Sequence, residues 1–158
     1  MIIKGIIETD HVNYKKLSMT IMFPRCSFKC DKECGQKVCQ NSPLINEPDI
    51  DIEMGKIVDR YINNPLTEAI VMQGLEPFDS WEDLFGLISH FRCKTSDDIV
   101  IYTGYNKDEI IDKILKLKSI NNCNIIIKFG RYIPGQEPHK DKILGVNLAS
   151  DNQYAEII

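Results

Sequence analysis

The chain has 158 residues, and 43% of them are hydrophobic, which is enough for one domain with its own core. Charged residues make up 27% and the formal net charge is −4, which argues against a disordered chain and against a general nucleic-acid coat protein. No apolar run approaches the ~20 residues of a membrane helix, and the first residues lack the pattern of a signal peptide. We therefore expect a single cytoplasmic domain over residues 1–158, with no membrane and no direct nucleic-acid partner.

The first third of the chain predicts two strands, a long loop and a helix. Residues 2–8 and 18–24 are rich in Ile, Thr, Met and Phe, as strands are. Residues 25–48 have no apolar periodicity and contain cysteines, prolines and lysines, which predicts a loop. Apolar residues then recur near the 3.6-residue period, which predicts a helix over 51–63.

The middle of the chain alternates apolar strands with helices. Strands are predicted over 68–73, 98–103 and 124–129, and helices over 81–92 and 107–118. Strands that are apolar almost throughout, with helices between them, are typical of a parallel sheet covered by helices. The predicted fold class is therefore α/β.

Two of the predicted helices begin with capping signals. Ser80 precedes the first, with Asp83 three residues later as a weak capping box. Asn106 precedes the second, with Glu109 three residues later.

The remaining chain, 130–158, contains Gly and Pro, so we expect irregular structure with short strands near 143–148 and 154–157. Ligands of parallel sheets bind beyond the carboxyl ends of the strands. The loops expected at that edge are 25–48, 74–80, 104–106 and 130–136.

Four of the six cysteines lie within 14 residues. In a cytoplasmic chain such crowding indicates metal or redox chemistry more than disulfides. Four thiolates could close a structural zinc site, whereas three could hold an iron–sulfur cluster with one open iron. The four are Cys26, Cys30, Cys34 and Cys39. The other two, Cys93 and Cys123, are expected to be inert small hydrophobes.

The cysteine loop resembles that of the radical S-adenosylmethionine (SAM) family, whose hallmark is Cys-x3-Cys-x2-Cys. Cys26-Ser-Phe-Lys-Cys30 matches the first half, and Val38-Cys39-Gln40-Asn41 is similar to the family's aromatic-Cys-His-Asn ending. Here eight residues, Cys34 among them, separate the last two ligands instead of two, and Val38 replaces the aromatic residue. The matching flanks favour Cys39 over Cys34 as the third ligand.

Three further segments resemble the same family in the same order. Gln73-Gly74-Leu75-Glu76-Pro77 resembles the Gly-Gly-Glu-Pro turn that receives the amino group of SAM, and Ile101-Tyr102-Thr103-Gly104-Tyr105 resembles the next strand end. The tail over 145–153 is similar to the Gly-Ser-Ser-Asn-Gln tail of one subgroup, the activating proteins of anaerobic (class III) ribonucleotide reductases. The resemblance covers residues 5–156.

The resemblance implies a partial (β/α) barrel of mainly parallel strands. It implies that Cys26, Cys30 and Cys39 hold a 4Fe–4S cluster, with no catalytic side chain beyond it. In the family, the open iron chelates SAM, and one electron cleaves the sulfonium to methionine and a 5′-deoxyadenosyl radical. The three histidines, which show no recognisable catalytic pairing, are consistent with this: His11, His90 and His139.

The resemblance also implies how SAM and the partners are bound. Gly74 and Glu76 would receive the amino group of SAM, and Thr103 and Tyr105 would line the adenosine pocket. The partner would be the large catalytic subunit of an anaerobic ribonucleotide reductase, which receives a glycyl radical. The electron would come from a donor such as a flavodoxin or a ferredoxin.

Three alternatives stay open at this point. The chain could be a radical SAM enzyme that acts on a small molecule, although such enzymes usually have a longer chain. It could be a zinc-binding interaction module that uses all four cysteines of the loop, in which case Cys34 matters as much as Cys39. It could also be a relative that keeps the fold but cannot cleave SAM.

Overall fold

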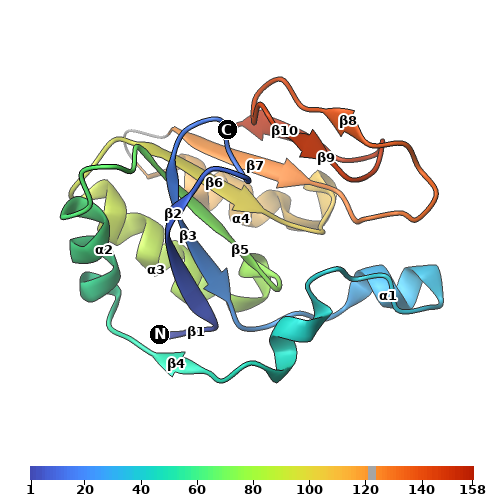
Figure 1. Ribbon diagram of the computed structural model, residues 1–158, viewed down its shortest axis with the longest axis horizontal. Coiled ribbons are helices and arrows are strands. Elements are labelled where there is room, and N and C mark those ends of the chain that lie inside the picture. The colour runs from blue at the N-terminus through green and yellow to red at the C-terminus, as the bar shows by residue number, and fades with distance from the viewer. Residues whose placement is uncertain (121–123) are drawn as a thin grey trace.

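The computed structural model describes residues 1–120 and 124–158 (Figure 1). Cys123, expected to be an inert hydrophobe, lies outside the described residues. In chain order the elements are β1 (Ile2–Ile3), β2 (Gly5–Asp10), β3 (Ser18–Phe23), α1 (Lys29–Cys34), η1 (Ser42–Asn46), β4 (Ile50–Asp51), α2 (Met54–Ile62), β5 (Ala69–Gly74), η2 (Pro77–Ser80), α3 (Trp81–Arg92), β6 (Asp98–Tyr102), η3 (Lys107–Ile110), α4 (Ile111–Lys118), β7 (Ile125–Phe129), β8 (His139–Lys140), β9 (Asn147–Leu148) and β10 (Tyr154–Ile157).

The main sheet has six strands in the order β10-β7-β6-β5-β3-β2. The four inner strands β3, β5, β6 and β7 run parallel, whereas the edge strands β2 and β10 are antiparallel to their neighbours. This confirms the predicted α/β class with a mostly parallel sheet. The edge strands β2 and β10 stand at opposite ends of this order, so the sheet is open.

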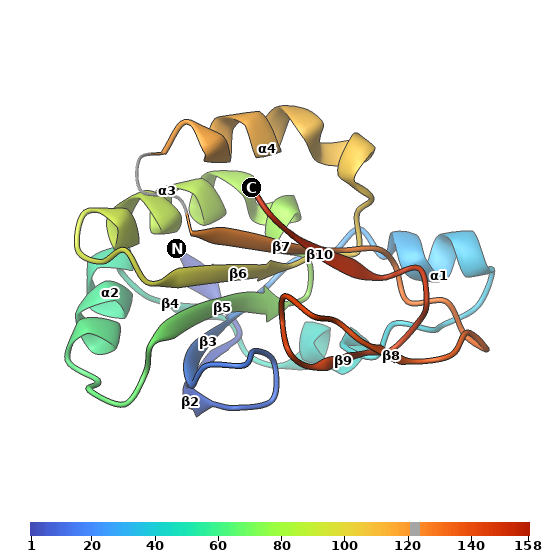
Figure 2. The same ribbon diagram turned by 90° about the horizontal axis from the view of Figure 1, so that it is seen from above.

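The inner strands send alternate side chains into two apolar layers. Ile70 lies in the layer formed with α2, α3 and α4, together with Leu84 and Ile114. Val71 lies in the opposite layer, where Leu148 of the C-terminal segment covers the sheet. Figure 2 shows α3 and α4 on one side of the sheet and β8 and β9 on the other. Because both faces are covered, the inner strands read as continuous apolar runs in the sequence.

The parallel register brings the carboxyl ends of the inner strands to one edge. Phe23 pairs with Gly74, and Tyr102 pairs with Lys128. In Figure 1 the inner strands point toward the side of the molecule that carries α1. This arrangement places the loops after the strands, including the cysteine loop, around a shared edge.

The predicted loop over 25–48 contains two short helices, α1 and η1. Each residue of α1 is at least partly exposed, so the helix has no apolar stripe that the sequence could reveal. Its start is also unusual, since the N-cap residue Phe28 has a left-handed backbone with φ 53°. The prediction of an irregular segment was therefore wrong for Lys29–Cys34 and Ser42–Asn46.

The helix predicted over 51–63 begins at Met54. Residues before it pair with the N-terminus instead: the Met1 amino group donates to the Ile52 carbonyl at 2.9 Å, and the Ile52 N–H donates back to Met1 at 3.0 Å. Ile52 is apolar because it packs on the main core rather than because it belongs to the helix.

One of the two predicted caps forms. Asn106 and Glu109 make a reciprocal capping box at η3, as predicted. Ser80 makes no side-chain cap, and its buried hydroxyl has no partner among the described residues. The reason is that the 3₁₀ turn η2 precedes α3, and the Glu76 side chain caps that turn through the Phe78 N–H.

The C-terminal segment is mostly irregular, as expected. The strand near 154–157 is β10, which confirms that prediction. The strand predicted near 143–148 is shorter and is paired with β8, a strand that was not predicted. Within residues 1–120 and 124–158, none of the helices has the length and apolar character needed to cross a membrane.

Candidate functional site

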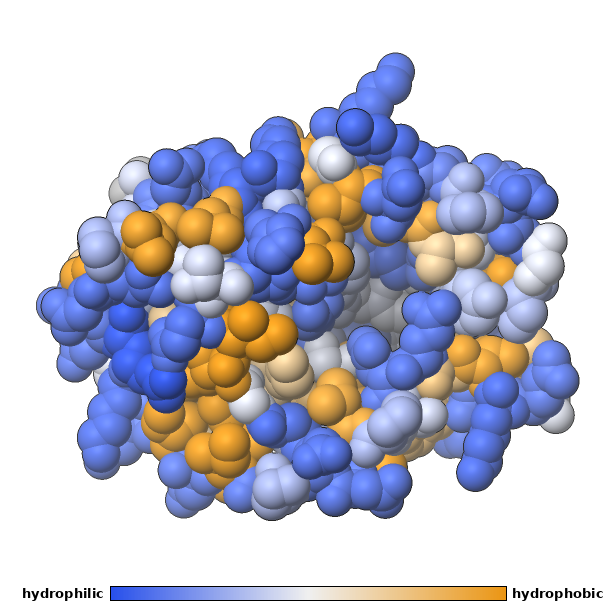
Figure 3. Space-filling view, in the orientation of Figure 1, coloured by the Kyte–Doolittle hydropathy of each residue, from blue (hydrophilic) through white to orange (hydrophobic). Residues whose placement is uncertain are grey.

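A cavity of about 280 Å³ opens where the inner strands end. Its walls come from the cysteine loop, the ends of β5, β6 and β7, and the C-terminal segment. Figure 3 shows a hollow to the right of the centre of this face of the molecule. Residues from every predicted motif line the cavity: Cys26, Cys30, Cys39, Gly74, Glu76, Thr103, Ala149 and Gln153.

Three of the four loop cysteines border this cavity. Cys26, Cys30 and Cys39 are half-buried there, whereas Cys34 is exposed and borders a neighbouring hollow together with Glu33. Cys30 also borders that hollow, so Cys34 differs from the other three in lying outside the cavity itself. Across the described ranges 1–120 and 124–158, no three His, Cys, Asp or Glu side chains are grouped so as to hold a single metal ion.

The three thiols share an environment that disfavours the free thiolate. Burial raises the pKa of the Cys26 thiol to about 12, and it raises the pKa of the Cys30 and Cys39 thiols as well. A negative charge on Cys39 adds to the rise in the pKa of the other two. Such thiols release their protons when a soft metal binds, because the metal ion supplies the positive charge that stabilises the thiolates. Three partly buried thiols on one cavity are a donor set that fits an iron–sulfur cluster.

Asp31 folds the long interval between Cys30 and Cys39 back on itself. One of its carboxylate oxygens accepts the N–H of Val38 at 2.8 Å and the N–H of Cys39 at 2.9 Å. The eight intervening residues therefore form α1 and a return segment instead of a wide loop. This is how Cys39 reaches the cavity despite its distance along the chain.

Asn41 ties the end of the cysteine loop to the next motif. Its side-chain N–H donates to the Gly74 carbonyl at 2.7 Å. Gly74 has φ +98°, and a Cβ atom at this position would lie 2.7 Å from the Phe23 nitrogen. Only glycine lets the end of β5 approach β3 so closely.

Glu76 joins the two predicted turns beneath the cavity. Its carboxylate accepts the Thr103 hydroxyl at 2.8 Å, the Gly104 N–H at 2.9 Å and the Phe78 N–H at 3.1 Å. Burial raises the pKa of Glu76 to about 7, although these hydrogen bonds act in the opposite direction. The carboxylate that the resemblance assigns to the SAM amino group thus also fixes the end of β6 against the end of β5.

The two residues expected to line the adenosine pocket point to different places. Thr103 is buried and lines the cavity. Tyr105 instead borders a smaller hollow, where its hydroxyl donates to Asp79 at 2.6 Å and its ring lies 4.5 Å from the ammonium of Lys29. Thus Gly74, Glu76 and Thr103 line the same cavity as the three cysteines, whereas Tyr105 borders the smaller hollow, which Cys26 and Cys30 also border. The roles of these residues toward SAM stay predictions.

Lys128 is a polar residue of the site that the sequence reading did not single out. It is 7% exposed, lies on β7, lines the cavity and donates to the Gly130 carbonyl at 2.9 Å. Burial lowers the pKa of its ammonium to about 8. The sequence does mark this residue, because Lys128 is the single charged residue in the otherwise apolar run Ile125–Phe129, and a buried charge in a strand is unusual.

Comparison with known proteins gives one match. The family described as a 4Fe-4S single cluster domain matches residues 16–154, a span that contains the cysteine loop and the whole of the cavity lining beyond Asn13. Comparisons with curated proteins and with solved structures found no match. Domains of the matching family are typical of radical SAM activating enzymes, and they bind a 4Fe–4S cluster together with SAM. The cavity with its three thiols and the family match agree, and the chain belongs to the family of 4Fe-4S single cluster domains of the radical SAM type.

Proposed function

We propose that this protein activates an anaerobic ribonucleotide reductase by generating a glycyl radical on the large catalytic subunit. One observation carries the proposal: a single cavity unites the three cysteines, the Gly-Leu-Glu-Pro turn and the C-terminal tail. The tail supports this target in particular. Its sequence is similar to that of the reductase-activating subgroup, and its residues Ala149 and Gln153 form part of the cavity wall.

The chain's own residues would hold and orient the cofactors. When bound, the cluster and SAM supply one-electron cleavage of the sulfonium bond and a 5′-deoxyadenosyl radical. The thiols of Cys26, Cys30 and Cys39 would hold the cluster at one end of the cavity. Gly74 and Glu76 fix the turn that faces it, because each is tied by hydrogen bonds to a neighbouring segment.

Gln153 keeps the tail in place at the cavity. Its side-chain oxygen accepts the Ala149 N–H at 3.0 Å and the Ser150 N–H at 3.3 Å, and its amide donates to the Gly130 carbonyl at 3.2 Å. The first two bonds close a turn within the tail, and the third holds the tail against the end of β7. The glutamine that ends the subgroup's tail motif therefore has a structural task at the rim of the site.

The test combines the reconstituted protein with a candidate partner. The protein is loaded anaerobically with iron and sulfide, reduced by a flavodoxin or a ferredoxin, and mixed with SAM and the large subunit of a class III reductase. Electron paramagnetic resonance is expected to show a glycyl radical that depends on SAM, and the Cys39→Ala variant is expected to produce none. Cleavage of SAM without any radical on the reductase would contradict the proposed partner, and it would leave a small molecule or another protein as the substrate.

A further inference from the structure

An ion pair between buried Arg131 and the more exposed Glu109 lies next to the cysteine loop. Arg131 follows the end of β7 and is 6% exposed. Its two terminal nitrogens each contact a carboxylate oxygen of Glu109 in η3 at 2.7 Å, so the pair is bidentate. Pairs of this geometry are the strongest and most directional ion pairs that proteins form.

The same pair is connected to α1 on both sides of Cys30. The ammonium of Lys29 lies 3.0 Å from the Glu109 carboxylate, and the Nε atom of Arg131 lies 3.1 Å from the Glu33 carboxylate. Lys29 precedes Cys30 directly, and Glu33 follows it three residues later. None of the six residues of α1 is fully buried. These charged contacts therefore attach α1 to the rest of the protein, whereas apolar packing attaches α2–α4.

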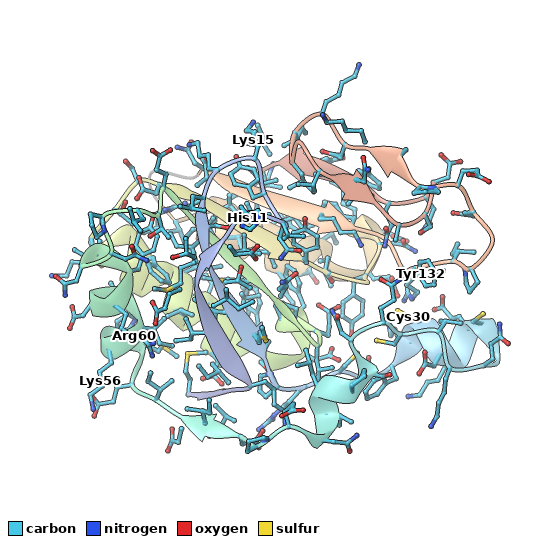
Figure 4. The ribbon with its side chains drawn as sticks, in the orientation of Figure 1. His11, Lys15, Cys30, Lys56, Arg60 and Tyr132 are labelled. Atoms are coloured by element: carbon cyan, nitrogen blue, oxygen red, sulfur yellow. The ribbon has the colours of Figure 1, made fainter. Side chains whose placement is uncertain are left out.

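Cys30 and Arg131 are also close to each other. Both border the two hollows that flank the loop. A Cβ atom built on Gly104 would lie 3.4 Å from the Cys30 sulfur and 3.8 Å from Cγ of Arg131, so both side chains lie next to this glycine. Figure 4 shows Cys30 at the start of α1, with Tyr132, the residue after Arg131, above it. The ion pair thus lies beside a thiol that borders the cavity.

We propose that Arg131 and Glu109 are positioning residues that hold Cys30 at the cavity and set the reduction potential of the bound cluster. Reduction adds one negative charge to the cluster. A charge that is shielded from water, as that of Arg131 is, therefore shifts the free energy of reduction. The guanidinium favours the reduced state and the carboxylate disfavours it, so the potential depends on the balance between them. The inference rests on cluster binding, which the family match shows, and is independent of the reductase partner.

The test is a redox titration of the reconstituted protein, followed by the spectrum of the reduced cluster. In Arg131→Gln a buried positive charge is lost and the Glu109 carboxylate keeps only its contact with Lys29, so the potential is expected to become more negative. At a fixed applied potential, the ratio of reduced to oxidised cluster should fall about tenfold. This corresponds to a shift in the reduction potential of about 59 mV for a one-electron couple. In Glu109→Gln the guanidinium keeps only the exposed Glu33 carboxylate as its counter-charge, so the potential is expected to move in the opposite direction.

Three further variants separate charge from simple loosening of the fold. Arg131→Lys keeps the charge and is expected to stay nearer the parent than Arg131→Gln. The double variant Arg131→Gln/Glu109→Gln restores the balance and should lie between the two single variants. Lys107→Gln removes the ion pair that Lys107, the first residue of η3, forms with Glu156 on the surface, and it should leave the potential unchanged.

Opposite shifts in the two single variants support the proposal. Equal potentials in the parent and the loaded variants, or shifts of both single variants in one direction, would overturn it. If Arg131→Gln holds no cluster, the comparison of Glu109→Gln and Arg131→Lys with the parent decides the question. A parent protein that never binds a cluster would count against the function of the whole site instead, which keeps the two failures apart.

Discussion

Gly74 shows how a single residue without a side chain determines the site. It ends β5 in a backbone conformation that L-residues rarely adopt, and it lies against the backbone of Met22 and Phe23. Its carbonyl is the acceptor through which Asn41 ties down the cysteine loop. The sequence identifies this glycine through its place in the turn motif, but not the contact with β3, because that contact depends on the register of two distant strands.

We expect Gly74→Ala to destabilise the protein by roughly 2–4 kcal/mol, because the added methyl group meets backbone atoms that cannot move aside. Chemical denaturation of the apo protein measures the loss. Gly55→Ala is the matched control: Gly55 lies in α2 with no atom within 4 Å of an added Cβ, so alanine there should be neutral or stabilising. Equal effects of the two substitutions would contradict this account of Gly74.

Glu109 makes a pH-dependent contribution to stability. Its hydrogen bonds with Arg131 lower the pKa of the carboxyl to about 2, below the ordinary 4.5. A lowered pKa in the folded state means that the stabilisation is present above pH 4.5 and is lost as the pH falls toward 2. Glu109→Gln should therefore cost about 1–3 kcal/mol at neutral pH, since it leaves the buried Arg131 less well paired and since part of the effect is screened by solvent.

Urea denaturation of the parent and Glu109→Gln at several pH values tests this. The difference between them is expected to shrink as the pH falls from 5 toward the pKa of about 2. A difference that stays constant over this range would show that charge at Glu109 does not carry the effect.

At the scale of elements, strands and helices were predictable to different degrees. The inner strands β5, β6 and β7 were predicted within about one residue of their observed ends, because burial on both faces makes them apolar throughout. The helix α1 was missed, since its contacts to the rest of the protein are charged rather than apolar. Charged contacts leave no periodic pattern in a sequence, and neither does the return of the chain at Asp31.

Asp31 is expected to be needed for cluster retention although it is no ligand. Asp31→Ala removes the acceptor that orients both Val38 and Cys39, so the third thiol should lose its place at the cavity. Iron and sulfide per chain after reconstitution should fall several-fold, while the melting temperature of the apo protein changes little. Asp31→Asn keeps one carbonyl oxygen and should retain most of the cluster.

Lys37→Ala serves as the control for Asp31, because this exposed residue belongs to the same segment. It should bind iron as the parent does. If Asp31→Ala binds as much iron as the parent, then the fold-back does not determine where Cys39 lies.

The whole molecule consists of a well-packed sheet layer and a cysteine segment held mainly by polar contacts. The sheet was predictable as a class, because alternating apolar strands and helices indicate a parallel sheet. The convergence of the cysteine loop and of the turns after β5 and β6 on one edge followed from the same rule. The cavity itself was not predictable, since Lys128 and Gln153 reach it only through the register of β7 and the path of the C-terminal tail.

The contrast between the packed sheet layer and the cysteine segment predicts where a protease cuts the protein first. Trypsin should first cut the apo protein at Lys32 and Lys37, which are exposed on or beside α1, and spare Lys56, which is exposed on the well-anchored α2. Loading the cluster should slow the cuts at Lys32 and Lys37 at least several-fold, because ligands that bind only the folded segment oppose its opening. Mass spectrometry of the fragments over time measures this, and equal cutting rates with and without iron would count against a cluster held by this segment.

In the proposed function, the three cysteines at the cavity support reductive cleavage of SAM and Cys34 lies outside the ligand set. The most direct measurement is the yield of 5′-deoxyadenosine and methionine from SAM and dithionite, for the reconstituted parent, Cys39→Ala and Cys34→Ala. The account predicts product from the parent and from Cys34→Ala, and none from Cys39→Ala. A parent that holds one zinc ion, takes up no cluster and forms no 5′-deoxyadenosine would contradict it, as would equal loss of activity in both variants.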